Sequence, residues 1–101
     1  MTEKQAEQVI ERYLVEQVKR LGGRAYKFVS PGNAGVPDRL VCLGGGAVIF
    51  VEVKSEGRKT GPLQVIQIGR LSRLGFDVRV IDGKEQVDKI INEYKASVQD
   101  E

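Results

Sequence analysis

The segment DRLVCLGGGAVIFVEVK, residues 38–54, contains two short apolar runs on either side of three consecutive glycines. Apolar runs of strand length that flank a glycine turn are typical of a β-hairpin, so we expect strands over 39–43 and 47–53. The four consecutive apolar residues 48–51 favour a second strand that is buried on both faces and central in its sheet. The hairpin is therefore the expected centre of the fold.

Helical and strand patterns alternate on both sides of this hairpin. Thr2 and Gln5 have the spacing of a capping box, which predicts a helix that starts near residue 3 and ends at Gly22-Gly23. We expect helices over 3–21, 62–74 and 84–94, strands over 24–29 and 76–81, a turn-rich loop over 30–37 and a fraying polar tail over 95–101. This order predicts an α/β fold in which helices flank a mixed β-sheet.

The composition narrows the chemistry that the chain can perform. Its 101 residues predict a single domain over 1–101, and a net charge of +2 decides nothing about partners. Histidine is absent and Cys42 is the one cysteine, which excludes His-ligated zinc, a Ser/His triad, a Cys/His pair and an internal disulfide. No apolar run is long enough to span a membrane and the N-terminus lacks a signal-like apolar core, so we expect a cytoplasmic protein.

Two acids and a lysine are expected to meet at one end of the hairpin. Glu52 and Lys54 are two positions apart on one strand, so their side chains share a face, and Asp38 opens the partner strand. A tight turn at 44–46 folds Asp38 back near Glu52 or Lys54. Carboxylates bind hard divalent cations such as Mg²⁺ or Mn²⁺, and a lysine can position an attacking water. The cluster therefore favours metal-assisted phosphodiester hydrolysis.

The motifs Val36-Pro37-Asp38 and Glu52-Val53-Lys54 resemble the active site of PD-(D/E)XK nucleases. Together with Pro62-Leu63-Gln64 before a helix, the segments 35–40 and 48–54 are similar to the VRR-NUC branch of that superfamily. The resemblance to this branch extends over nearly the whole chain. The resemblance implies an α-β-β-β-α-β-α core, a stand-alone protein of a bacterial or phage-infected cell, and a Mg²⁺- or Mn²⁺-dependent DNA endonuclease. It also implies a homodimer that acts on branched DNA such as Holliday junctions.

The resemblance also implies roles for individual residues. Asp38 and Glu52 would hold the metal, Lys54 would assist the nucleophile, and Gln64 would support the site. An acid of the first helix would complete it, either Glu7 or Glu11. Glu7 lies within the apolar stripe and matches a Glu-x-x-Ile start, so we prefer it as the metal ligand. Glu11 lies at the edge of the stripe and matches the acid of archaeal junction resolvases.

Each motif also has a simpler explanation. Glu52 and Lys54 can form a salt bridge at a strand end, and Glu93-Tyr94-Lys95 repeats the Glu-x-Lys pattern on a predicted helix. A non-catalytic DNA-binding module, or a nuclease subunit whose specificity lies on another chain, is the alternative function. Six cations flank the proposed site in sequence and are expected to contact DNA phosphates: Lys27, Arg39, Arg58, Lys59, Arg70 and Arg73.

Overall fold

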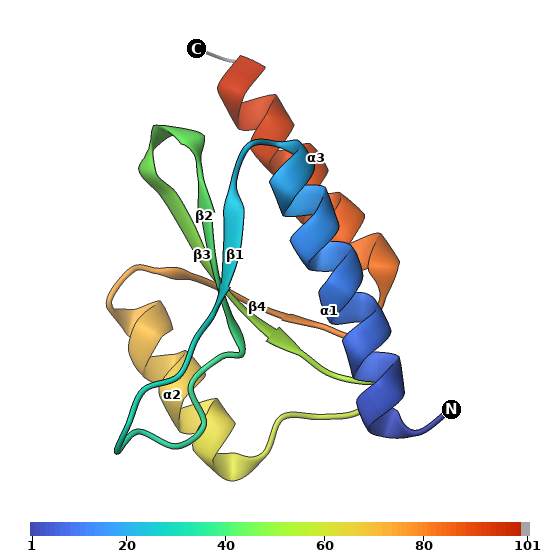
Figure 1. Cartoon of the computed structure of the whole chain (residues 1–101). Coiled ribbons are helices and arrows are strands. Elements are labelled where there is room, and N and C mark those ends of the chain that lie inside the picture. Colours follow the sequence, from blue (N-terminus) through green and yellow to red (C-terminus); the bar gives the residue numbers. More distant parts are fainter. Residues whose placement is uncertain (100–101) are drawn as a thin grey trace.

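The computed structural model, which describes residues 1–99, contains the predicted hairpin (Figure 1). Its strands are β2 (Arg39–Leu43) and β3 (Ala47–Val53), which pair antiparallel across the turn Gly44–Gly46. Gly45 and Gly46 have φ values of 75° and 77°, a left-handed conformation that residues with a side chain rarely adopt. The three glycines therefore make the turn tight enough to fix the register of the two strands.

Two more strands complete a mixed sheet with the order β1-β2-β3-β4. β1 (Arg24–Lys27) runs antiparallel to β2, and β4 (Asp77–Ile81) runs parallel to β3. The predicted mixed sheet is confirmed, and β3 lies inside it. β1 ends before residue 29 because the chain leaves the ladder after a last hydrogen bond, 2.8 Å long, from the Phe28 amide to the Asp38 carbonyl.

Helices lie on both faces of the sheet (Figure 1). α1 (Glu3–Arg20) and α3 (Lys84–Gln99) cover one face, and α2 (Pro62–Arg73) lies against the other. The apolar core lies between the sheet and the α1–α3 layer. Its fully buried side chains include Leu14, Val18, Val41, Val51 and Val87. α2 contributes no fully buried side chain, so the second face is only thinly covered.

The thin cover over the second face corrects one expectation about β3. The sequence predicts that the strand is buried on both faces, but Val48, near the turn, is 37% exposed. The reason is that α2 lies near the other end of the hairpin (Figure 1). Nearer α2, Phe50 packs against Phe28 and Phe76 with ring centroids 5.5 Å apart in each pair. The second face is therefore apolar in its middle and open near the turn.

The helix ends mostly follow the sequence signals. The Thr2 hydroxyl accepts from the Gln5 amide and the Gln5 side chain accepts from the Thr2 amide, which forms the predicted capping box. The predicted fraying tail is wrong for residues 95–99, which extend α3. The Tyr94 hydroxyl anchors this last part of the helix by donating to the Gly44 carbonyl at 3.1 Å. Residues 100–101 lie outside the described residues.

None of the helices described within residues 1–99 is long and apolar enough to cross a bilayer.

The fold brings three points of the chain together: the start of β2, the end of β3 and the start of α2. The candidate site is built where these three ends meet.

Candidate active site

Asp38 is held in place by the backbone of the opposite strand. Its Oδ2 accepts a hydrogen bond of 3.0 Å from the Val53 amide, and its own carbonyl accepts from the Phe28 amide. Arg39 lies opposite Val51 in the hairpin register, so the next position of each strand sets Asp38 opposite Glu52. Residues that lie opposite each other on paired strands project from the same face. The two carboxylates therefore meet at the end of the hairpin.

Glu52 is a buried carboxylate, only 2% exposed, on the face of β3 that points toward α2. Its Oε2 lies 3.3 Å from the Lys54 ammonium and accepts a 2.7 Å hydrogen bond from the Gln64 amide group. Its Oε1 is buried and has no hydrogen-bond partner among residues 1–99. A buried carboxylate oxygen without a partner is costly, so this atom is available for a ligand.

Gln64 connects the start of α2 to Glu52. Its Oε1 accepts from the Gly61 amide at 2.9 Å, which satisfies a free N–H at the beginning of the helix, while its Nε2 donates to Glu52. Pro62 starts the helix at a position where its missing N–H is not needed. One side chain therefore both caps α2 and orients the buried carboxylate, whereas Gln67, one turn later, makes no such bond among the described residues.

Gly35 lets the loop before Asp38 pack onto the first turn of α2. Its φ is +91°, and a Cβ at this position would lie 2.6 Å from the Leu63 carbonyl carbon and 2.9 Å from the Gln64 nitrogen. Such contacts are too short for any residue other than glycine. The loop that delivers Asp38 and the helix that carries Gln64 are thus fixed against each other, a role that the turn-rich sequence alone did not reveal.

Both carboxyl groups of the site hold a proton more tightly than they would in water. Burial, followed by the charge of Asp38, raises the pKa of Glu52 to about 7, against the opposing effect of Lys54. Burial also raises the pKa of Asp38, although the hydrogen bond from Val53 opposes that shift. Burial is thus the main reason why these two carboxyl groups resist ionisation, and the repulsion between them adds to it.

A divalent cation fits this arrangement. Asp38 and Glu52 offer hard oxygen ligands, and a cation between them would relieve their repulsion. Within residues 1–99, no three acidic, histidine or cysteine side chains stand close enough to share one ion. Two carboxylates with water in the remaining positions is a ligand set that Mg²⁺ accepts.

The two candidate acids of α1 lie on the other face of the sheet. Glu11 Oε2 accepts a 2.7 Å charge-assisted hydrogen bond from Arg39 Nε, and its negative charge contributes to the raised pKa of Asp38. Glu7, one helical turn earlier, is half-buried and makes no hydrogen bond or ion pair with the described residues. The structure thus brings Glu11 within electrostatic reach of Asp38.

The six flanking cations are distributed over several elements. Lys27 and Arg39 are neighbours across β1 and β2, while Arg58 and Lys59 lie in the loop after Lys54. Arg58 forms an exposed ion pair with Glu3 at 3.2 Å. Arg70 and Arg73 lie on the last turns of α2. The six cations therefore come from four separate segments: β1, β2, the loop after β3 and α2.

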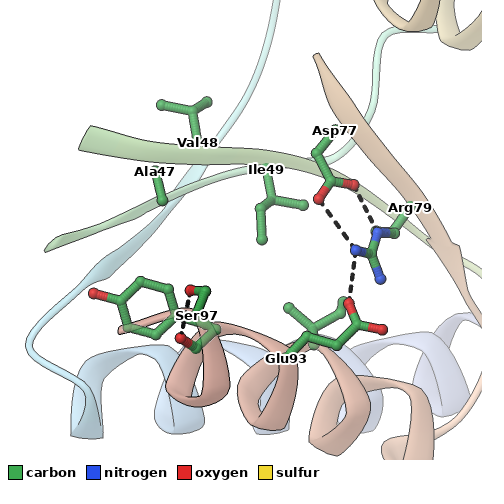
Figure 2. Close-up of a pocket in the computed structure, with 9 residues that line it drawn as sticks. Ala47, Val48, Ile49, Asp77, Arg79, Glu93 and Ser97 are labelled. Carbon is green, nitrogen blue, oxygen red and sulfur yellow. Dashed lines mark hydrogen bonds and ion pairs between the residues drawn. The ribbon is translucent and has the colours of Figure 1, made fainter. Parts of the chain in front are cut away.

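The second Glu-x-Lys sequence, Glu93-Tyr94-Lys95, lies on α3. Glu93 is on α3, as expected, and accepts a 2.8 Å hydrogen bond from Arg79, which also binds Asp77 (Figure 2). These three side chains line a pocket of about 300 Å³ between β3, β4 and α3. Glu93 is therefore part of an ion-pair network in which two carboxylates share one arginine, and among residues 1–99 its Glu-x-Lys sequence has no Asp38-like partner on a hairpin.

Comparison with known proteins identifies the family. No family model matches the chain. A solved structure of a VRR-NUC domain is 37% identical, with a TM-score of 0.82, over 88% of this chain and 97% of that one. The chain belongs to the VRR-NUC family. A second solved VRR-NUC domain protein, 20% identical, shares the fold with a TM-score of 0.68 over 93% of this chain and 88% of its own.

A relative in sequence agrees with this assignment. The protein named "Putative nuclease p44" of Acyrthosiphon pisum secondary endosymbiont phage 1 is 52% identical over 79 residues. The match covers 78% of this chain and 85% of the phage protein. The predicted VRR-NUC resemblance and the predicted α/β fold are both confirmed.

We expect Glu52 to make the stability of this metal-free VRR-NUC domain depend on pH. Because its pKa is raised from 4.5 to about 7 on folding, the folded protein retains a proton that the unfolded chain has released. This contribution to the free energy of unfolding is complete below about pH 4.5 and is lost as the pH rises through 7.

Chemical denaturation with chelator present between pH 4.5 and 8 measures the effect. Glu52→Gln should flatten the decline of stability with rising pH, whereas Glu56→Gln, an exposed acid of the following loop, should leave it unchanged. Parallel pH profiles for wild type and Glu52→Gln would contradict the expectation.

Proposed function

We propose that the chain is a metal-dependent DNA endonuclease that hydrolyses phosphodiester bonds and prefers branched DNA. The observation that carries the proposal is the buried Glu52 carboxylate, held by Gln64 and Lys54 beside Asp38 with one oxygen left without a partner among residues 1–99. Membership of the VRR-NUC family and the nuclease name of the phage relative support it.

Asp38 and Glu52 are the residues that would hold Mg²⁺ or Mn²⁺. When bound, such an ion lowers the pKa of a coordinated water and neutralises charge on the phosphate. Gln64 keeps Glu52 Oε2 oriented by its 2.7 Å hydrogen bond, which leaves Oε1 for the ligand. The Val53 amide does the same for Asp38, so each carboxylate has one oxygen fixed by the protein.

Lys54 supplies the positive charge of the site. Its side chain is 15% exposed, and its ammonium lies 3.3 Å from Glu52 Oε2 at the end of β3. From this position it can orient the attacking water or stabilise the negative charge that develops on the phosphate. A simple salt bridge between Lys54 and Glu52 would explain neither why a second carboxylate, Asp38, lies beside Glu52 nor why Glu52 Oε1 is buried without a partner among residues 1–99.

Glu11 is the acid of α1 that we propose supports the site through its charge rather than as a third metal ligand, with Glu7 as the alternative. Its charge already acts on Asp38, and Arg39 holds it at that end of the sheet. The helix periodicity alone favours Glu7 instead. The orientation of α1 across the sheet, which the periodicity does not contain, is what supports Glu11.

Resolution of a branched substrate needs two cuts, and one such site cuts one strand. A homodimer with two-fold symmetry would supply two sites, and we propose this assembly. The exposed apolar side chains Leu63, Val65 and Ile66 on α2 support it, because a surface helix with no fully buried side chain and an apolar outer side is typical of a contact between subunits.

The first expected outcome concerns the metal and its ligands. Cleavage of labelled DNA should require Mg²⁺ or Mn²⁺ and stop with chelator. Asp38→Asn and Glu52→Gln should each lower the cleavage rate at least about 100-fold, since removal of a ligand costs more than removal of its outer partner. DNA binding should stay similar or become tighter because a negative charge is removed.

Two further variants sharpen this test. Lys54→Ala should lose cleavage while metal binding, measured by calorimetry, is retained, and Glu56→Gln should cut at the wild-type rate. DNA binding without cleavage under all metal conditions would support the non-catalytic module instead. Cleavage undiminished by chelator would remove the metal from the proposal.

The acid of α1 can be identified by a matched pair of variants. Glu11→Gln should raise the Mg²⁺ concentration needed for half-maximal cleavage, because it removes a negative charge near Asp38. Glu7→Gln should leave that concentration close to the wild-type value. The reverse pattern would assign the role to Glu7, and no effect from either variant would exclude an electrostatic contribution of α1 to the site.

Assembly and substrate preference are tested together. Sedimentation velocity at micromolar concentration should give twice the 11.2 kDa mass of the chain, and four-way junctions should receive paired, symmetric nicks. Ile66→Glu should dissociate the dimer, whereas Asn92→Glu, at an exposed position of α3, should not. A monomer that makes single nicks in flaps would exclude both the dimer and the junction preference.

A further inference from the structure

A groove runs between α1 and β1, on the sheet face opposite the Glu52 carboxylate. Its two halves have volumes of about 450 and 380 Å³ and share the lining residues Val15, Lys27 and Arg39, so they form one continuous depression. We call it the α1–β1 groove. Its charged lining residues are Glu11, Arg12, Lys19, Arg24, Lys27 and Arg39.

The α1–β1 groove is strongly positive. Five cations line it against one carboxylate, and that carboxylate, Glu11, is already paired with Arg39. The other four cations are exposed and take part in no ion pair among residues 1–99. The pocket beside α3 is the opposite case, because Asp77 and Glu93 neutralise its Arg79 (Figure 2). Unneutralised positive charge thus distinguishes the groove from that pocket.

The groove begins beside the candidate active site. Lys27 lies opposite Arg39, which directly follows Asp38 in the chain. From there the groove follows α1 along β1, as its lining residues show. β1 is an edge strand of the described sheet (Figure 1). Arg12 and Lys19 are seven residues apart, about 10 Å along the helix, which equals roughly three base-pair steps along the axis of a DNA duplex. The groove therefore has both the length and the position to receive DNA next to the cleaved bond.

We infer that the α1–β1 groove binds the phosphodiester backbone of the DNA arm that leads away from the cleavage site. The inference rests on the proposed function, because it takes DNA as the substrate. Lysine and arginine contacts to phosphates add affinity without sequence preference. The groove thus assigns a DNA-binding role to Arg12, Lys19 and Arg24, three cations that do not flank the catalytic motifs in sequence.

Two double variants on opposite walls of the groove test the inference. Arg12→Gln with Lys19→Gln changes the helix wall, and Arg24→Gln with Lys27→Gln changes the strand wall. Lys89→Gln with Lys95→Gln, two exposed cations of α3 that do not line the groove, is the control of equal charge change. Fluorescence anisotropy with a labelled junction, without divalent ions and over a range of KCl concentrations, gives the Kd and its salt dependence.

Each groove variant should bind more weakly than wild type and lower the slope of log Kd against log salt by about 2, roughly one for each phosphate that the protein no longer neutralises. The α3 control should keep the wild-type slope. If both groove variants match the control while wild type binds and cuts DNA, the groove inference is wrong and the proposed function stands. If wild type neither binds nor cuts DNA, the proposed function fails and the groove inference falls with it.

Discussion

The buried carboxylate of Glu52 is the constraint on which the rest of the site depends. Withdrawal of a charge from water costs several kcal/mol unless other groups compensate for it. Burial, followed by the charge of Asp38, raises the pKa of Glu52 to about 7, although Lys54 opposes the shift. Lys54 and Gln64 contact Oε2, but Oε1 has no partner among residues 1–99. A protein selected for stability alone would place an apolar residue here. The presence of a buried carboxylate, despite its unfavourable free energy, indicates a ligand whose binding compensates for that burial.

The hairpin register keeps this carboxylate in place. A shift of one residue would turn Glu52 into the α1–α3 core and bring an apolar neighbour to the α2 face. The glycine turn, the Asp38–Val53 hydrogen bond and the contact between Gly35 and the first turn of α2 each oppose such a shift from a different direction. The geometry of the site is thus determined by backbone contacts more than by its own side chains.

The sequence was sufficient for features that depend on neighbouring residues. The hairpin strands, the capping box at Thr2 and the start of α2 at Pro62 all follow from local patterns. Features that depend on how elements pack were missed: the extension of α3 past Tyr94, the exposure of Val48 and the pairing of Arg39 with Glu11. The periodicity of α1 favours Glu7, whereas the charge that acts on Asp38 favours Glu11, because a helical wheel shows which side faces inward but not which turn lies nearer Asp38.

Alternation along one strand explains how two faces of the sheet can serve one substrate. Asp38 and Arg39 are consecutive, so the first contributes to the site beneath α2 while the second points to α1 and binds Glu11. The Asp38 carboxylate of the proposed active site and the Arg39 guanidinium that lines the α1–β1 groove are thereby held close together by adjacent positions of one strand. Under the proposed function, the position of β1 at the edge of the described sheet leaves the side of the α1–β1 groove open to a DNA arm.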